Sequence, residues 1–130
     1  MPSFSERSLR RLETCHPDLQ RLFHEVVKHV DCMVIFGFRT REEQEQAFED
    51  GNSDKHWPDS LHNKTPSQAV DVAPYPVDWK NEDRFRAFGG FVLGVASQMG
   101  IPIRWGGDWD GDWDFSDQRL VDQPHFELRR

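Results

Sequence analysis

The stretches of this sequence that could form β-strands are all short, which limits the size of the sheet that the chain can build. Runs rich in β-branched and aromatic residues, or alternating in polarity, occur at 32–38, 68–73, 101–105 and 125–128. The third run contains Pro102, which has no amide proton to donate, so we expect it at a sheet edge. Helical patterns lie between the runs. The sequence therefore predicts an α+β fold, with a small, mostly antiparallel sheet of about four strands covered by helices.

Helices are predicted by amphipathic spacing and by their end residues. Residues 17–30 carry apolar side chains at helical intervals and begin with a proline. Thr40 followed by Glu43 forms a capping box, which predicts a helix that ends near Gly51. A longer apolar stripe runs from Glu82 to Met99, just before Gly100. Residues 1–13 are polar and predict only a short helix or an arm. These helices would cover one side of the sheet.

The composition limits the class of protein. The chain has 130 residues, 36% of them hydrophobic, with five Trp and ten Phe, enough for one folded domain spanning 1–130. A formal charge of -7 without a basic run argues against nucleic acid as a partner. No stretch resembles a signal peptide or a membrane span, so we expect cytoplasmic synthesis and no stable membrane insertion. The two cysteines, Cys15 and Cys32, match no metal motif and are expected to be free thiols, although a disulfide remains possible.

Two separate stretches hold the residues that could carry chemistry. In the last predicted strand His125 and Glu127 share one face, because side chains alternate along a strand. If the apolar side chains of that strand pack beside Val70 and Val72, then His125 and Asp71 emerge together on the opposite face of the sheet. His62 lies in the long loop 51–67, and loops of this length are usually functional.

Two histidines and one carboxylate are a ligand set for catalytic zinc, which keeps one position open for water. Zinc lowers the pKa of that water to about 7 and polarises a peptide carbonyl. From residue types alone, however, a His and an Asp on the open face of a sheet are more often an ordinary solvated pair than metal ligands.

The ordered set of motifs resembles a known family. Ser60-x-His62, Ala69-x-Asp71 and Asp122-x-x-His125 occur in the order found in zinc peptidases related to D-alanyl-D-alanine carboxypeptidases. The pattern is most similar to phage endolysins of the L-alanyl-D-glutamate peptidase type. The similarity extends from about residue 17 to residue 128 and includes two further segments, Gly37-Phe38-Arg39-Thr40 with Gln44, and Arg104-Trp105-Gly106-Gly107-Asp108-Trp109.

The resemblance implies roles for individual residues. One zinc ion would be held by His62, Asp71 and His125. Asp122 would be the catalytic carboxylate that accepts a proton from water and passes it to the leaving amine. The substrate-binding residues would be Arg39, Ser60 and Gln44, with Arg39 offering its guanidinium to a substrate carboxylate.

One departure from the family pattern concerns the first ligand. The gap between His62 and Asp71 is two residues longer than the common His-x6-Asp spacing, and Pro66 replaces a glycine-bearing turn. His56 is therefore an alternative ligand, although Ser60 before His62 favours the latter.

The function implied is that of a single catalytic domain, 1–130, without a separate cell-wall-binding domain. It would be a monomeric hydrolase that cuts the L-alanyl-D-glutamate bond of the peptidoglycan stem peptide after the membrane has been permeabilised. Two alternatives remain: a D-alanyl-D-alanine carboxypeptidase or dipeptidase, and a zinc-containing module that binds cell wall without cutting it.

The acidic loop 108–114 carries Asp at alternate positions, which suggests calcium. It departs from the EF-hand pattern, so a solvated loop is the expectation. Three tryptophans, Trp105, Trp109 and Trp113, are candidates for lining a substrate groove.

Overall fold

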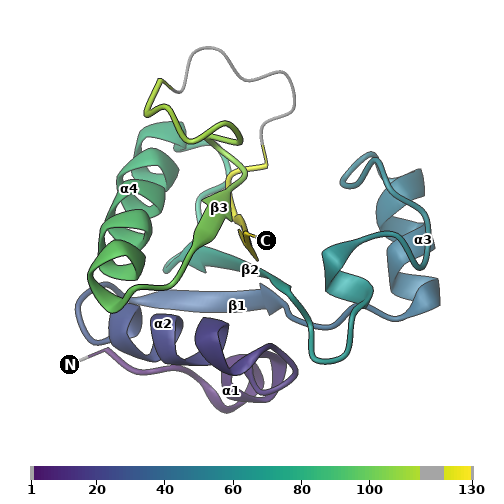
Figure 1. Cartoon of the computed structure of the whole chain (residues 1–130), viewed down its shortest axis with the longest axis horizontal. Helices are drawn as coiled ribbons and strands as arrows, with labels where there is room; N and C mark the ends of the chain where they lie inside the picture. Colours follow the sequence, from purple (N-terminus) through teal and green to yellow (C-terminus); the bar gives the residue numbers. More distant parts are fainter. Residues whose placement is uncertain (1, 115–121, 130) are drawn as a thin grey trace.

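The structure, a computed structural model, describes residues 2–114 and 122–129 (Figure 1). The elements follow the predicted order, with one additional short turn of 3-10 helix. The helices and strands are α1 (Glu6–Leu12), α2 (Pro17–Val27), β1 (Cys32–Phe36), α3 (Arg41–Glu49), η1 (Leu61–Asn63), β2 (Ala69–Pro74), α4 (Glu82–Met99), β3 (Ile103–Trp105) and β4 (His125–Leu128).

The sheet has four strands in the order β1-β2-β4-β3, and every neighbouring pair is antiparallel. The predicted α+β class and the number of strands are therefore confirmed. β3 lies at an edge, as Pro102 predicted, but it begins only after the proline, at Ile103. β1 forms the other edge and ends at Phe36, two residues before the predicted end.

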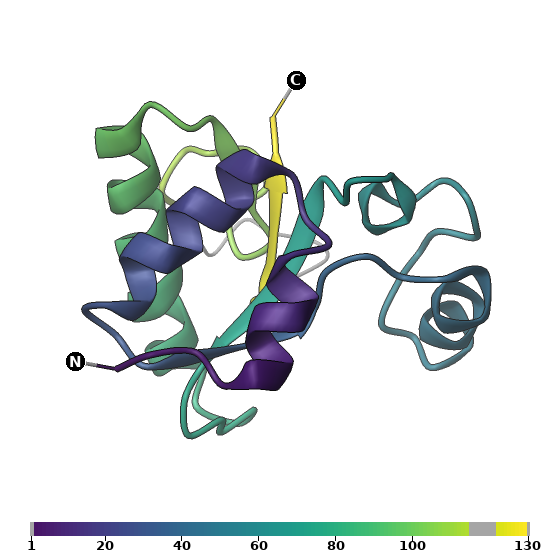
Figure 2. The same ribbon diagram turned by 90° about the horizontal axis from the view of Figure 1, so that it is seen from below.

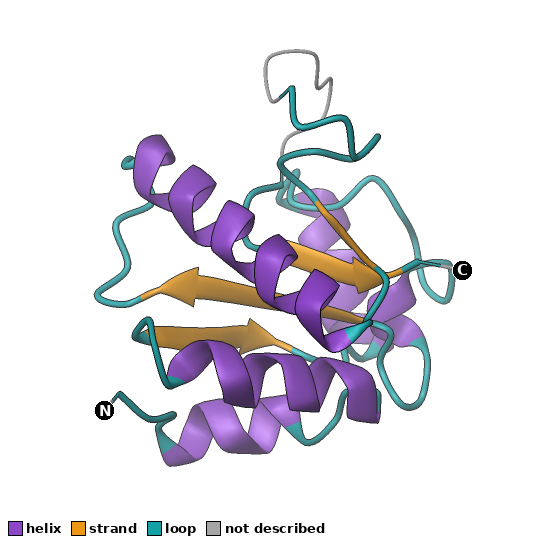
Figure 3. Ribbon diagram, turned by 60° about the vertical axis from the view of Figure 1, so that its left-hand side comes forward, coloured by secondary structure: helices purple, strands orange, loops and turns teal. Residues whose placement is uncertain are grey.

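Helices α2 and α4 lie together across one face of the sheet (Figure 3). The predicted apolar stripes supply the core: α2 contributes Leu19, Leu22, Phe23, Val26 and Val27, and α4 contributes Phe85, Phe88, Val92 and Ala96. Val70 and Val72 of β2 and Phe126 and Leu128 of β4 belong to the same cluster. The intervening residues of β2 and β4 therefore project from the other face, as the strand alternation predicted.

Helix α1 covers the exposed edge of β1. Ser8 Oγ accepts a hydrogen bond from the Val34 amide at 3.0 Å, and Arg11 donates to the Val34 carbonyl at 3.0 Å. These two side chains satisfy strand groups that a fifth strand would otherwise bind, so the helix protects the edge from pairing with another chain. Both cysteines are buried free thiols, and burial raises the pKa of each to about 12.

Helix α3 and the loop after it lie to one side of the sheet, beyond the end of β1 (Figures 1 and 2). Both hydrogen bonds of the predicted capping box are present: the Thr40 side chain accepts from the Glu43 amide, and the Glu43 side chain accepts from the Thr40 amide. The loop is less irregular than predicted, because residues 61–63 form the 3-10 turn η1. Among the described residues, no helix is both long enough and apolar enough to cross a membrane.

Candidate metal centre and active site

Three side chains predicted as metal ligands meet on the face of the sheet opposite α2 and α4. Asp71 of β2 and His125 of β4 are direct partners in the antiparallel register, and His62 approaches them from η1. His62 Nε2, Asp71 Oδ1 and His125 Nδ1 form a triangle in which each pair of atoms is 3.2 Å apart. All three residues are buried, and they lie on the sheet face that α2 and α4 leave uncovered.

The triangle fits a tetrahedral zinc ion. Zinc binds His nitrogen and Asp oxygen at about 2.0–2.1 Å, so two ligand atoms at tetrahedral corners lie about 3.3 Å apart. The three observed separations of 3.2 Å agree with this value within about 0.1 Å. Three protein ligands leave a fourth corner for water or substrate, which is the pattern of a catalytic rather than a structural zinc site.

The outer ring nitrogen of His62 is held by backbone. Nδ1 lies 2.8 Å from the carbonyl oxygen of Gly37, just beyond the end of β1. A carbonyl can only accept, so Nδ1 carries the proton and Nε2 presents its lone pair to the ligand triangle. Two further bonds hold the turn: the Arg39 amide donates to the His62 carbonyl at 2.9 Å, and the His62 amide donates to Ser60 Oγ at 3.2 Å.

The outer nitrogen of His125 is held by a carboxylate. Nε2 donates to Glu127 Oε1 at 2.8 Å, and Glu127 Oε2 accepts from Arg104 at 2.7 Å. Arg104 is the cross-strand partner of Glu127, so the β3–β4 register creates this ion pair. The other ring nitrogen, Nδ1, is thereby directed at the triangle. Metal-ligating histidines commonly have such a partner, which fixes the ring and raises its basicity.

Asp71 is bound on its other oxygen by Arg39. The guanidinium donates to Asp71 Oδ2 at 3.2 Å and to Gln44 Oε1 at 3.1 Å, and it lies 4.8 Å from the centre of the Phe36 ring. Gln44 is fully buried, and its amide nitrogen donates to Ser53 Oγ and to the Lys55 carbonyl. Arg39 is therefore a buried member of the site rather than a surface ion pair.

Asp122 lies beside the ligand triangle, at the half-buried start of the turn that leads into β4. The His125 amide donates to the Asp122 carbonyl at 3.0 Å, which places Asp122 Oδ2 4.0 Å from His125 Nδ1. Gly106 makes this approach possible, because a Cβ there would lie 2.0 Å from the Asp122 carbonyl oxygen. The Asp122 amide also donates to the Gly106 carbonyl at 2.9 Å.

The electrostatics favour a cation at the centre of the cluster. Burial alone would raise the pKa of Asp71, but the charge and hydrogen bonds of His62 and His125 outweigh it and hold the pKa far below its usual range. Burial alone would lower the pKa of His125, but its bonds to Asp71 and Glu127 raise it to about 10. Without a metal ion, the imidazole of His125 therefore holds an additional proton, which a bound metal ion would displace.

The pKa of Asp122 is shifted in the opposite direction to that of Asp71. Burial and then the negative charge of Asp71 raise the pKa of Asp122 to about 6. A carboxylate with a pKa near neutrality is suited to both accept and release a proton during a reaction cycle.

Several sequence expectations require correction. His56, the alternative ligand, lies outside the triangle: Nδ1 is 2.7 Å from Glu45 Oε2, and its ring stacks on Phe48. Trp105 cannot line a groove, because it is completely buried and its indole donates to the Gln123 carbonyl at 2.7 Å. Trp109 does lie near the site, with its ring centre 5.4 Å from that of His125, whereas Trp113 is exposed.

Carboxylate oxygens of Asp108, Asp110 and Asp112 come within 4.8 Å of one another, but they form no part of the site. The expected solvated loop is confirmed for residues 110–114, which are exposed, whereas Asp108 is buried.

Two contributors to the site had no role in the sequence analysis. Glu127 was placed on the same face as His125 by strand alternation, and this signal could have identified it as the partner of the ring. Asn63 is buried, and its amide donates to the Arg39 carbonyl at 3.1 Å and to Gln44 Oε1 at 3.2 Å. No sequence pattern predicted the contact between Asn63 and Arg39, because these residues lie in two separate loops.

Comparison with known proteins identifies the family. Residues 2–129 match the family described as phage L-alanyl-D-glutamate peptidase. The L-alanyl-D-glutamate peptidase of Escherichia phage T5 is 28% identical over 133 residues, covering 96% of each chain.

Similar solved structures include the following two. The L-Ala D-Glu endopeptidase ChiX of Serratia marcescens superposes with a TM-score of 0.76 at 29% identity, over 98% of this chain and 91% of that one. A mutant of the vancomycin resistance D,D-pentapeptidase VanY, in complex with Zn(II), has a TM-score of 0.53 at 16% identity, over 91% of this chain and 70% of that one, and shares the fold. With nearly its whole length matched, the chain belongs to the phage L-alanyl-D-glutamate peptidase family.

Proposed function

We propose that this chain is a zinc-dependent peptidoglycan endopeptidase that hydrolyses the L-alanyl-D-glutamate bond of the stem peptide. The observation that carries the proposal is the ligand triangle, with 3.2 Å between each pair of donor atoms and with both outer histidine nitrogens already bonded. His62, Asp71 and His125 would hold the ion. Two neutral imidazoles and one carboxylate leave the bound ion a net positive charge.

When bound in such a site, zinc lowers the pKa of a water molecule and polarises the scissile carbonyl. We assign the proton transfer to Asp122. Its carboxylate takes the proton from the attacking water and delivers it to the nitrogen of the leaving D-glutamyl residue as the peptide bond breaks. Its location on the turn before His125, half-buried beside the triangle, supports this assignment.

Arg39 has two proposed tasks. It orients Asp71 through Oδ2, and Gln44 in turn orients Arg39. One donor of the same guanidinium, Nε, is buried without a hydrogen-bond partner among the described residues. A carboxylate of the stem peptide that reached this group would satisfy it, which supports the substrate-binding role of Arg39. Gln44 would act through Arg39 rather than on the substrate, since its own polar atoms are bonded within the protein.

With this substrate, the enzyme would act on the cell wall. A separate membrane-permeabilising protein would be needed for a chain made in the cytoplasm to reach peptidoglycan. All seven residues assigned to metal, proton transfer and substrate lie in one chain, and we expect that chain to act as a monomer.

Metal content and product analysis test the proposal together. Purified protein should contain about one zinc per chain, lose activity on chelation, and regain it when zinc is returned. Digestion of purified peptidoglycan should create new amino termini on D-glutamate.

Two other outcomes are informative. Release of D-alanine instead would indicate a carboxypeptidase, and binding without any new termini would indicate a non-catalytic module. His56→Ala serves as the control for His62→Ala: only the latter should lose zinc.

A further inference from the structure

A basic pocket lies directly behind the segment that holds His62. It has a volume of about 260 Å³ and is lined by Arg7, Arg10 and Arg11 of α1, by Thr14, by the chain 36–38 and by Glu43. We propose that this pocket binds an anionic group of the cell-wall polymer, a carboxylate or a phosphate, while the stem peptide occupies the metal centre. This inference rests on the proposed function.

The three arginines place like charges together on one short helix. Arg7 and Arg11 are four residues apart, a spacing at which like charges on a helix repel. Their present partners neutralise little of this charge. Arg11 donates to the uncharged Val34 carbonyl, and Arg10 pairs with Glu6 at 3.3 Å in a solvent-exposed contact. Among the described residues, Arg7 has no hydrogen bond or ion pair.

One acidic group also faces the pocket. Glu43 accepts a hydrogen bond from the Thr40 amide through Oε1, as part of the capping box of α3. Its single charge against three arginines leaves the lining positive, in a chain whose formal net charge is -7. A concentration of positive charge on an acidic protein is a feature that helps to attract an anionic ligand.

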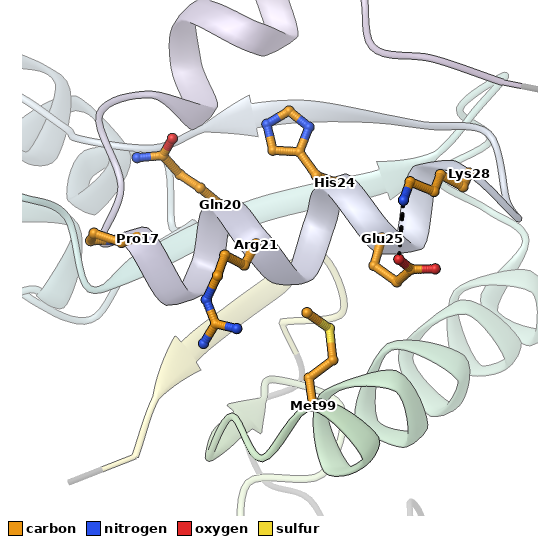
Figure 4. A pocket seen from close by; sticks show the side chains of 7 residues that line it. All are labelled: Pro17, Gln20, Arg21, His24, Glu25, Lys28 and Met99. Atoms are coloured by element: carbon orange, nitrogen blue, oxygen red, sulfur yellow. Dashed lines mark hydrogen bonds and ion pairs between the residues drawn. The ribbon is translucent and has the colours of Figure 1, made fainter.

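A second, larger hollow provides the contrast. The groove between α2 and α4, of about 640 Å³, also contains cationic side chains (Figure 4). There, however, Arg21 pairs with Asp18 at 2.9 Å and Lys28 with Glu25 at 3.3 Å. The groove also lies on the helical side of the sheet, away from the metal centre. In the α1 pocket only Arg10 has such a partner, and among the described residues Arg7 and Arg11 pair with no carboxylate. These two unpaired charges and the position next to the site distinguish the α1 pocket.

The pocket and the metal centre share a wall. The Gly37 carbonyl holds His62 Nδ1 on one side of this segment. On the other side, a Cβ at Gly37 would lie 2.3 Å from both the Arg11 carbonyl oxygen and Thr14 Oγ1, so α1 is in close contact with the segment. Thr14 Oγ1 also accepts from the Phe38 amide at 2.8 Å. Arg39, the proposed substrate-binding arginine, follows one residue later.

The chemistry of the lining selects the ligand class. Guanidinium groups bind carboxylate and phosphate oxygens through paired hydrogen bonds. Liquid water takes about 30 Å³ per molecule, so the pocket volume accommodates such a group with part of its hydration shell. In a cell wall these anions have two sources: the free carboxylates of neighbouring stem peptides, and the phosphates of accessory polymers.

The test compares two double variants that remove the same charge. Arg7→Gln with Arg10→Gln empties the pocket of two cations, and Arg21→Gln with Lys28→Gln removes two cations from the groove of Figure 4. Both are made in an Asp122→Asn background, and binding to purified peptidoglycan is measured by co-sedimentation at low ionic strength. We expect Kd to rise about threefold to tenfold for the pocket variant and less than about twofold for the groove variant. The difference should shrink as salt is added.

Two substrate treatments identify the source of the anion. If phosphate-containing polymers are stripped and the difference disappears, the ligand is a phosphate; if amidation of the wall carboxyls removes it, the ligand is a carboxylate. Equal Kd changes in the two double variants, or no change in either, would overturn the proposal.

Activity separates this inference from the proposed function. In an otherwise wild-type background, the pocket variant should keep the kcat of the parent protein on a short soluble stem peptide, with an unchanged Tm. Absence of cleavage by the parent protein itself would refute the proposed function, whereas a binding difference would still be measurable.

Discussion

The metal centre has two halves that are built in different ways. Asp71 and His125 form the strand half: they are register partners on β2 and β4, so backbone pairing sets their separation. His62 forms the loop half, and individual hydrogen bonds position it: His62 donates to the Gly37 carbonyl and to Ser60 Oγ, and its own carbonyl accepts from the Arg39 amide. The two halves meet in a regular triangle, in which every pair of ligand atoms is 3.2 Å apart.

The difference shows which part of the site can tolerate changes in sequence length. A residue inserted into β2 would turn Asp71 to the opposite face of the sheet. The loop before it has no such constraint, because His62 is fixed by contacts at its own turn rather than by the length of chain that follows. The chain can therefore carry two extra residues between His62 and Asp71 while His62 still lies 3.2 Å from Asp71 Oδ1.

The largest effect is expected at Asp122, which lies on the turn before β4 and is the proposed proton acceptor. Asp122→Asn removes the proton acceptor but no metal ligand, so kcat should fall by about 10²-fold to 10⁴-fold while zinc content is retained. Activity and metal content are measured on the same sample. Asp83→Asn, at an exposed position of α4, is the control and should behave like the parent protein. Full activity of the Asp122 variant would remove this residue from the mechanism.

The next effect concerns the partner of His125. Glu127→Ala frees the outer nitrogen of the ring and leaves Arg104 without its carboxylate. We expect zinc affinity to fall by about 10-fold to 100-fold, as for other partners of metal-bound histidines. Competition with a chelator measures the affinity, and Glu127→Gln, which retains an acceptor oxygen, should recover part of it. An unchanged affinity in the alanine variant would show that the sheet alone orients His125.

The pH dependence of activity should reflect Asp122. Burial and the charge of Asp71 raise its pKa to about 6, and only the deprotonated form can accept a proton. The rate should therefore fall as pH decreases through this pKa, and a bound cation would move the limb to lower pH. Between pH 7 and pH 5, kcat/KM should fall by at most about tenfold. A limb well above pH 6 in the zinc-loaded enzyme would contradict the assignment.

The strand half was also the part that sequence could predict. Alternation along 68–73 and 125–128 placed Asp71 and His125 on one face, and the register confirms that they meet. The same alternation placed Glu127 beside His125 without revealing their bond. Periodicity carries this information because a strand has a fixed repeat.

The loop half lacks such a repeat. His62 was assigned by resemblance, and nothing in residues 51–67 predicted the turn η1 or the contact between Asn63 and Arg39. Trp105 was misplaced for a related reason: its neighbours in β3 indicated a strand, but which side chains are covered depends on how α4 and β4 pack around it.

A smaller effect is expected from loosening the loop half. Asn63→Ala removes the acceptor of the Ser60 amide and the donor to Arg39 and Gln44, all of them buried. Leaving these groups unsatisfied should reduce the free energy of unfolding by about 1–3 kcal/mol. Chemical denaturation measures this, and Asn52→Ala, at an exposed position after α3, is the matched control. Equal stability of the two variants would show that the loop half does not depend on the Asn63 bonds.

The smallest effect distinguishes two roles for Ser60, which the family resemblance assigns to the substrate and the structure places under the His62 amide. Ser60 Oγ accepts from that amide at 3.2 Å, as a helix cap does. Ser60→Ala should therefore reduce stability by about 1 kcal/mol. If capping is its only task, zinc affinity should weaken slightly and KM should stay unchanged once zinc is saturating. If the hydroxyl also donates to substrate, KM should rise under the same conditions while Ser60→Thr, which retains the oxygen, restores it. Measuring KM at saturating zinc therefore separates a residue that shapes the loop half from one that contacts the substrate.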